Sequence, residues 1–459
     1  MLTTIVIVFV IYLAAMLVIS WQGRKHASTF DEFLSVGRKT PMILLIGGAV
    51  GAQVGNGLVV GGGAEGAAIG LSGAGYGLAC AFSYLVIYLY SNWVYRSGYM
   101  TPADYFQKKY NSNAMGQMFN VVGGIGCFPG IGAQIMAAKI LFDALGMNST
   151  FGVIALCVVV FLYSQISGLW GAYATSVVQI VVIAVGVLAG LVYVIASGGW
   201  GEITAAVASG ALPETYLNFN GYDLATWMII VIPMILVAPL DNVSWQRIHS
   251  AESEKAARNH LWIATLVMLP ICIAPVIIGM YGRVHYNLSG NTAFFGVILN
   301  TFPPILAALV VVAVIAAVMS TIDGMLIASS TLYIRGFYKN VINKNATDEQ
   351  MQKMTLPMNI ITILLAAYFA FSSNTIVGLL SNMYVFTGSA LLAPLICGWF
   401  WKGTTTKGAL AGVIVGTAYG ALQLFGIYSL PWSGITYVIP SFAALFIVSL
   451  LTKEKEVAR

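Results

Sequence analysis

Charged residues are scarce in this chain. They make up 8% of its 459 residues, whereas soluble domains carry about 25%. Hydrophobic residues account for 59%. This composition excludes an ordinary soluble domain, because there are too few charged side chains to cover a surface exposed to water. Many apolar runs are long enough to cross a bilayer as helices, which takes about 20 residues each. The sequence therefore predicts an all-α integral membrane protein with the lipid bilayer as a partner.

Histidine and cysteine are also rare. The four histidines fall in predicted loops or at the ends of spans, and the five cysteines are scattered without metal-like or disulfide-like spacing. Since no His and Cys cluster suits a catalytic metal, a membrane enzyme is disfavoured. The basic residues are dispersed among loops rather than gathered on one face. The net charge of +5 therefore gives no reason to expect a nucleic-acid partner.

Apolar segments along the chain predict about thirteen membrane spans, the first near 3–21 and the last near 433–452. Basic residues concentrate in alternate loops, at 24–39, 96–109, 247–258, 335–353 and 402–407, and in the tail. Such loops lie on the cytoplasmic side of a membrane. An odd number of spans then places the N-terminus outside and the C-terminus in the cytoplasm. We expect a multi-pass protein of the cell membrane.

Two of the predicted spans contain helix breakers. The second span, about 41–69, is crowded with glycine from Gly47 to Gly63, and the seventh contains Pro233 and Pro239. Interrupted helices at corresponding places in two halves are typical of transporters built from inverted repeats, with the binding site at the breaks. Backbone groups freed inside a membrane are tolerated where they face a cavity, a ligand or other protein. The alternative is that the glycines only allow close helix packing.

A run at 316–323 places Ser320, Thr321 and Asp323 inside an otherwise apolar span. Polar side chains in hydrocarbon are costly and usually mark an ion or substrate path. Two hydroxyls and nearby backbone carbonyls supply the hard, neutral oxygens that suit a sodium ion. The alternative is that both hydroxyls bond back to the preceding helical turn.

The chain resembles the sodium:solute symporter family over nearly its whole length. The resemblance rests on the run at 316–323, on 168–179 with its Gly-Leu-Trp-Gly-Ala-Tyr-Ala-Thr sequence, and on Trp-Gln-Arg at 245–247. It implies one transporter domain, 1–459, with a LeuT-like fold of two inverted five-helix repeats. Repeat one would cover about 41–197 and repeat two about 224–428, with flanking helices at about 3–21 and 433–452.

The resemblance also implies the ligands of a sodium ion, which is the cofactor expected here. They are the hydroxyls of Ser320 and Thr321 and the carbonyls of Ala317, Gly51 and Val54. Many relatives have Asp at the position of Ser176, where it is associated with a further cation site. Because Ser176 has no charge, we expect one sodium ion per transport cycle.

Asp241 is the principal candidate for binding the substrate. It lies just after Pro239, and the sequence 241–247 most resembles the urea and polyamine branch of the family. A buried carboxylate needs a counter-charge, hydrogen-bond donors or a proton, which favours a cationic or amide substrate. The alternatives are a salt bridge to Lys139 or solvation near the cytoplasmic end of the span. The other candidate substrate-binding residues are Gln53, Asn56, Phe128, Asn242 and Trp245.

These features together predict a sodium-coupled symporter that imports a small polar organic solute by alternating access. A cationic amine, a polyamine or a urea-like compound is the first candidate. A zwitterion or carboxylate such as an amino acid or pantothenate is the alternative substrate. A channel or sensor on the same fold is the alternative activity, because fold does not fix function.

Overall fold

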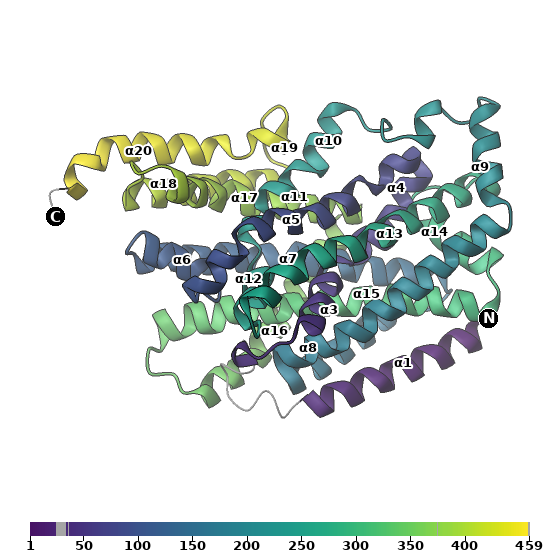
Figure 1. Cartoon of the computed structure of the whole chain (residues 1–459), viewed down its shortest axis with the longest axis horizontal. Helices are drawn as coiled ribbons and strands as arrows, with labels where there is room; N and C mark the ends of the chain where they lie inside the picture. The colour runs from purple at the N-terminus through teal and green to yellow at the C-terminus, as the bar shows by residue number, and fades with distance from the viewer. Residues whose placement is uncertain (24–33, 35, 374, 458–459) are drawn as a thin grey trace.

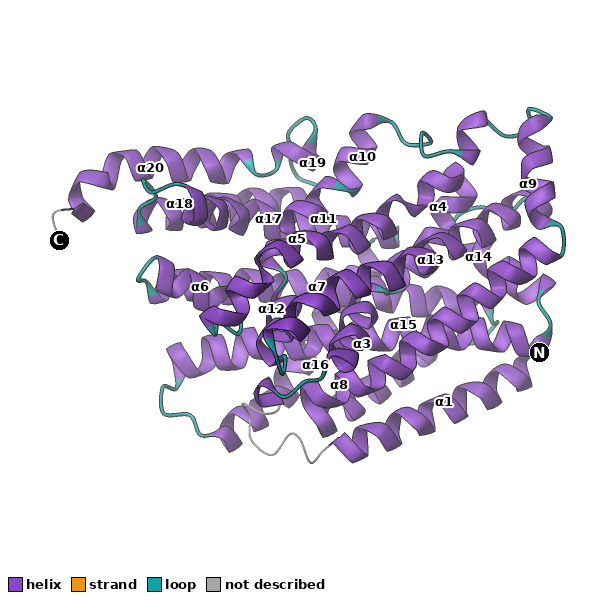
Figure 2. Cartoon of the chain, viewed as in Figure 1, coloured by secondary structure: helices purple, strands orange, loops and turns teal. Residues whose placement is uncertain are grey.

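The computed structural model of the chain describes residues 1–23, 34, 36–373 and 375–457, and at 163, 165–167 and 453–457 it describes the backbone alone. The basic residues Arg24 and Lys25 and the histidine His26 lie outside the described residues. Figure 2 shows that the described chain is helical. Its β pairing is limited to one isolated bridge between Thr40 and Ala251. The all-α class expected from the composition is confirmed.

Nineteen α-helices form the described part of the chain. They are α1 (Leu2–Gly23), α3 (Met42–Gln53), α4 (Gly62–Ile69), α5 (Gly75–Ser97), α6 (Pro102–Lys109), α7 (Asn113–Ala144), α8 (Ser149–Ala196), α9 (Gly199–Ala208), α10 (Leu224–Ile230), α11 (Ile232–Val237), α12 (Asn242–Ser250), α13 (Glu254–Tyr286), α14 (Asn291–Thr301), α15 (Pro304–Ser330), α16 (Asp348–Ser372), α17 (Ile376–Phe400), α18 (Thr406–Leu424), α19 (Ser433–Thr436) and α20 (Ile439–Val457). Two π-helical segments, Gly57–Gly61 and Thr331–Ile342, join them.

Nine helices in the described residues are long and apolar enough to cross a membrane, or ten if the bent pair formed by Leu224–Leu240 and Asn242–Ser250 is one span. This number is smaller than the thirteen or so spans predicted. The second predicted span is divided between the short helix α3 and a second part that runs on into α5. The fifth predicted span corresponds to Ser149–Leu162, which is also too short for the criterion. The glycine-rich α18 is not among the nine.

The helices run roughly along the longest axis of the molecule, and the two termini lie at opposite ends (Figure 1). Helix α6 lies near the end where the chain finishes, whereas α9 and α14 lie near the end where it begins. Helix α15 lies in the interior. In the most apolar stretch of the span that contains it, 83% of the residues are buried, against 17% in the most apolar stretch of α1. The polar run at 316–323 is therefore enclosed by other helices.

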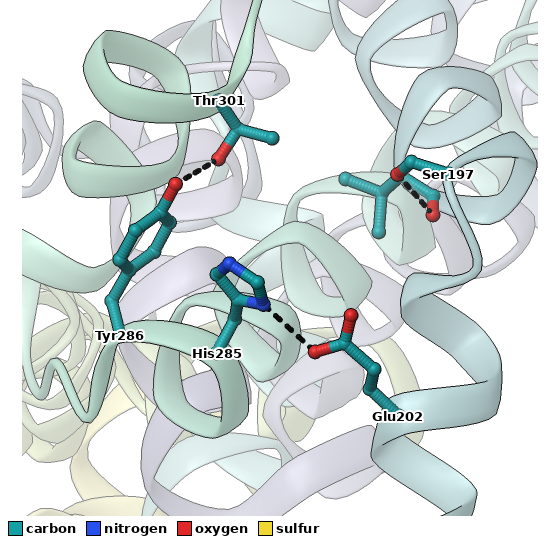
Figure 3. Close-up of polar contacts among 6 residues, drawn as sticks. Ser197, Glu202, His285, Tyr286 and Thr301 are labelled. Atoms are coloured by element: carbon teal, nitrogen blue, oxygen red, sulfur yellow. Dashed lines mark hydrogen bonds and ion pairs between the residues drawn. The ribbon is translucent and has the colours of Figure 1, made fainter.

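At the end of the bundle where α9 and α14 lie, polar contacts fasten the connecting helices (Figure 3). His285 Nδ1, near the end of α13, pairs with Glu202 of α9 at 2.8 Å. The Tyr286 and Thr301 hydroxyls lie 2.8 Å apart and join α13 to α14. These contacts involve half-exposed side chains, so they position the helices at this end without forming part of the buried site.

Candidate functional site

The second predicted span is interrupted at the end of α3. Val54 has φ −79° and ψ 66°, which ends the helix, and the chain resumes as a π-helical turn at Gly57. Gly55 lies in the gap, where a methyl group would be 2.8 Å from the Thr321 hydroxyl oxygen and 2.9 Å from the Gln134 amide nitrogen. Glycine is therefore required for α15 and α7 to approach the break so closely.

The hydroxyls of α15 meet the backbone of α3 at this break. Ser320 Oγ donates to the Gly51 carbonyl at 2.8 Å and lies 3.2 Å from the Ala317 carbonyl, and Thr321 Oγ1 lies 3.4 Å from the Gly51 carbonyl. The structure thus joins four of the predicted sodium ligands, and Val54, the fifth, ends α3 one turn after Gly51. The hydroxyls do not bond only to their own helix. Neutral oxygens gathered in a buried place suit a dehydrated alkali cation.

A third hydroxyl adjoins this cluster. A methyl group added at Gly51 would lie 3.0 Å from Ser176 Oγ, so α8 brings Ser176 against the same stretch of α3. From the sequence, Ser176 was notable only for lacking the charge of an aspartate. Its closeness to Gly51 is a tertiary contact that sequence spacing does not indicate.

Asn56 supports the break instead of lining a cavity. Its backbone N–H donates to Gln134 Oε1 at 2.9 Å, and its side-chain amide lies 3.4 Å from both Gln134 Oε1 and the Val314 carbonyl. Gln134 of α7 therefore satisfies a backbone donor that the helix break would otherwise leave unpaired in the interior. Gln134 was missed by sequence reasoning, and the only signal was an amide side chain in an apolar span.

A cavity of about 110 Å³ opens beside the break. Its wall is mostly apolar, with a few polar side chains, as in typical small-molecule sites. Ala52 and Gln53, the two residues after Gly51, form part of this wall, so the hydroxyl cluster and the cavity share one segment of α3. The polar lining residues are Gln53, Ser83, Tyr84, Asp241, Asn242, Arg247, Tyr384 and Thr387. A second cavity of about 290 Å³ lies between α6, Asn120 of α7 and the π-helical segment that begins at Thr331 after α15.

Asp241 lines the cavity where the seventh predicted span is broken. Pro239 lies in a short 3₁₀ turn, and α12 starts at an angle of 43° after it. The Asp241 carboxylate caps α12, since it accepts hydrogen bonds from the Val243 and Ser244 N–H groups at 3.2 and 3.1 Å and from the Ser244 hydroxyl. The salt bridge to Lys139 is excluded, because Lys139 pairs with Asp143 at 3.4 Å on an exposed face of α7.

The other predicted substrate residues divide into two groups. Gln53 and Asn242 line the cavity. Phe128 and Trp245 do not belong to its lining. Phe128 stacks on Tyr333 with ring centroids 6.3 Å apart. Trp245 is fully buried, and its indole N–H donates to the Pro239 carbonyl at 3.0 Å. Trp245 thus fastens the break, since it bonds the backbone of the turn that precedes α12.

Arg247 is the residue whose position differs most from the sequence analysis, which grouped it with a cytoplasmic loop. The structure buries it, with 3% of the residue exposed, and places it in the cavity wall. A methyl group at Gly48 would lie 3.2 Å from Arg247 Nε and 2.6 Å from the Tyr173 ring. Glycine in α3 therefore makes room for the guanidinium.

Asp323 is buried one turn after Ser320, with 1% of the residue exposed. Ser164 Oγ of α8 donates to its Oδ1 at 2.5 Å. Oδ2 has no hydrogen-bond partner in the described part of the chain. The Asp323 carboxylate therefore bonds α8 through Oδ1, and this oxygen is not directed at the Gly51 cluster.

Two interrupted helices, a buried hydroxyl–carbonyl cluster and an adjoining cavity define a class of protein: an all-helical secondary transporter with a LeuT-like fold. Solved structures agree on the fold. A Na⁺-coupled sialic acid symporter superposes with a TM-score of 0.82 over 98% of both chains at 18% identity. A nucleobase-cation-symport-1 family transporter gives a TM-score of 0.56 over 92% of this chain and 94% of its own, at 12% identity.

The sequence comparison then gives the family. The model of the sodium:solute symporter family matches residues 33–416, so the chain belongs to that family: it is a sodium-coupled solute symporter, not an enzyme. The high-affinity proline transporter PutP of Bacillus subtilis is 26% identical, over 95% of this chain and 96% of its own. The high-affinity choline transporter 1 of Torpedo marmorata is 26% identical over 90% and 75%, and the sodium/pantothenate symporter of Haemophilus influenzae is 25% identical over 72% and 70%.

Proposed function

We propose that sodium binds at the α3 break, among Gly51, Val54, Ala317, Ser320 and Thr321, and drives import of a small polar organic solute bound in the adjoining cavity. One observation carries this proposal. Ser320 Oγ reaches the Gly51 carbonyl across the break at 2.8 Å, and the next two residues of α3 line the cavity. Ion and solute thus act on the same short segment.

Coupling follows from this shared segment. A sodium ion held by both α3 and α15 favours the conformation in which these helices are close together, because a ligand shifts a population only through its differential affinity for the two states. The same conformation sets the position of Ala52 and Gln53 in the cavity wall. Alternating access would then be a movement of the two repeats, about 41–197 and 224–428, relative to each other. The membrane potential contributes about 2.3 kcal/mol per charge per 100 mV to import.

The solute is proposed to contact Gln53, Asp241 and Asn242, the predicted residues that the cavity exposes. Asp241 already accepts three hydrogen bonds from α12. A carboxylate can accept about four hydrogen bonds. The Asp241 carboxylate can therefore accept one more, from a donor group of the solute. The relatives are named as transporters of proline, choline and pantothenate. These names support a small organic solute, but the three compounds differ in charge.

For orientation, we propose that the end of the bundle holding α6 faces the cytoplasm and that the N-terminus lies outside. Basic residues in alternate loops support this assignment, and so do the two termini at opposite ends of the molecule (Figure 1). The membrane proposed is the cell membrane, across which an inward sodium gradient is available for import.

Uptake into proteoliposomes tests the function. With sodium outside and potassium inside, a labelled solute should accumulate above its external concentration, and abolishing the gradient should abolish accumulation. Equilibration without accumulation would indicate a channel, and binding without movement would indicate a sensor.

Two hydroxyl variants locate the ion. Ser320→Ala and Thr321→Ala should each reduce the apparent affinity for sodium by about tenfold or more, since each removes one oxygen ligand. Ser329→Ala is the matched control, because Ser329 is buried in the same helix and its hydroxyl donates to the Leu326 carbonyl of that helix at 2.9 Å. Unchanged sodium activation in both Ser320→Ala and Thr321→Ala would remove these residues from the ion site.

A further inference from the structure

Arg247 is a buried cation, and two of its guanidinium nitrogens have no hydrogen-bond partner among the described residues. It is 3% exposed, and Nε and Nη1 have no hydrogen-bond partner in the described part of the chain. A buried charge without a partner is among the costliest features of a membrane protein, and such residues mark substrate or ion paths. Because Arg247 also lines the cavity beside α3, the missing partner has a place to bind.

The surrounding acids are committed elsewhere. No described carboxylate lies within ion-pair distance of Arg247. Asp241 lines the same cavity but bonds the first turn of α12, and Asp323 accepts the Ser164 hydroxyl. Tyr173, which packs beside Arg247, has its hydroxyl 3.4 Å from Ser250. Among the described residues, the structure thus encloses a guanidinium without a carboxylate counter-ion.

Asn242 provides a second, independent observation. It is 8% exposed and lines the cavity, and neither its Nδ2 nor its Oδ1 has a hydrogen-bond partner among the described residues. A buried amide with both ends unpaired costs free energy unless a ligand or water pairs with it. Asn242 and Arg247, two residues with unpaired donors, therefore line one small cavity together with the acceptor Asp241.

We propose that the transported solute carries a carboxylate that binds Arg247 and a cationic nitrogen that faces Asp241, which makes it a zwitterion of the amino-acid class. This inference rests on the proposed function, and it replaces the purely cationic solute that Asp241 alone suggested. A guanidinium and a carboxylate match as a fork with two parallel hydrogen bonds. A solute with a cation only would bring a second positive charge next to the unpaired Arg247. A cavity of about 110 Å³ favours a small member of the class.

The test is the thermal stability of the purified full-length protein in detergent, in sodium or in potassium. The probes are the twenty proteinogenic amino acids, their carboxamides, choline, spermidine and urea. At least one free amino acid should raise the melting temperature in sodium only. Its carboxamide, which keeps the cationic nitrogen and loses the negative charge, should bind at least about tenfold more weakly, since a charge-assisted hydrogen bond is lost.

Variants assign the effect to Arg247. Arg247→Gln should weaken binding of that amino acid at least about tenfold and leave binding of the carboxamide nearly unchanged. Arg247→Lys keeps the positive charge but loses the paired hydrogen bonds of the guanidinium, so it should bind the amino acid with intermediate affinity. This variant replaces Arg247→Gln in the test if Arg247→Gln does not fold. Arg258→Gln should have no effect, because Arg258 is exposed and lies over the Tyr88 ring, 4.4 Å from its centroid. Stabilisation by sodium alone should persist in every Arg247 variant.

The inference is overturned if only choline, spermidine, urea or the carboxamides stabilise the protein, if no amino acid does, or if an amino acid binds Arg247→Gln as tightly as the unmodified protein. In each of these cases, stabilisation by sodium that is lost in Ser320→Ala would leave the proposed function standing. If sodium has no effect on the unmodified protein, the proposed function fails and this inference fails with it.

Discussion

The interruption after α3 and the interruption before α12 use different residues and present different chemistry. The first is made by glycine, with Gly55 in the gap, and the Gly51 carbonyl beside it accepts from the hydroxyl of Ser320 and lies near that of Thr321. The second is made by proline, and it presents the charged side chains Asp241 and Arg247. A break at a glycine lets the α15 hydroxyls come close to a backbone carbonyl, and neutral oxygens close together suit an ion. A gap followed by a new helix projects side chains into a cavity, which suits an organic solute.

The largest effect is expected at the second break. Trp245→Ala should lower the free energy of unfolding by about 3–5 kcal/mol, because it removes a fully buried indole from a packed cluster. Trp245 packs against Tyr90 and Trp93, with ring centroids 6.4 and 6.0 Å away, and its N–H bonds the Pro239 carbonyl. Denaturant unfolding in detergent measures the loss.

Trp21→Ala is the control for a tryptophan outside this cluster, being 57% exposed on α1, and it should change the free energy of unfolding far less. If Trp245→Ala is as stable as Trp21→Ala, the aromatic cluster does not hold the second break in place.

A smaller effect is expected at the first break. Gly55→Ala should lower the free energy of unfolding by about 1–3 kcal/mol, the usual cost of overpacking. The new methyl group would be 2.8 Å from Thr321 Oγ1 and 2.9 Å from the Gln134 amide. It should also reduce stabilisation by sodium, because it pushes α15 away from α3.

Gly62→Ala is the matched control, since a methyl group at Gly62 would lie 3.6 Å from Val276, an ordinary contact. The two variants are compared by measuring how the melting temperature of each rises with sodium concentration. Equal sodium responses in Gly55→Ala and Gly62→Ala would mean that the ion does not bind at the gap.

The smallest effect on stability is expected at Lys139, whose salt bridge to Asp241 the structure excludes. Lys139→Met should change stability by about 0.5 kcal/mol or less, because Lys139 forms an exposed i,i+4 pair with Asp143. Sodium-driven uptake should remain near that of the unmodified protein, whereas Asp241→Asn should impair it. A loss of uptake in Lys139→Met as large as in Asp241→Asn would contradict the separate positions of the two side chains.

The sequence predicted the class and the two interrupted helices, because each depends on local features: apolar length, glycine and proline. The sodium ligands stay a prediction, although the structure brings Ser320 and Thr321 to the Gly51 carbonyl. It did not predict that Gln134 supports the first break or that Ser176 adjoins Gly51, since both are contacts between distant helices. It also placed Arg247 in a loop, because a basic residue after an apolar span is usually solvated. Burial of that arginine depends on how α12 packs against α3, which local sequence does not specify.

Binding of ²²Na⁺ to the purified protein at equilibrium tests the central claim most directly. If the gap after α3 and the hydroxyls of α15 form the ion site, binding should be saturable, should be lost or weakened at least about tenfold in Ser320→Ala, and should be retained in Ser329→Ala. The same sodium affinity in Ser320→Ala as in the unmodified protein would contradict it.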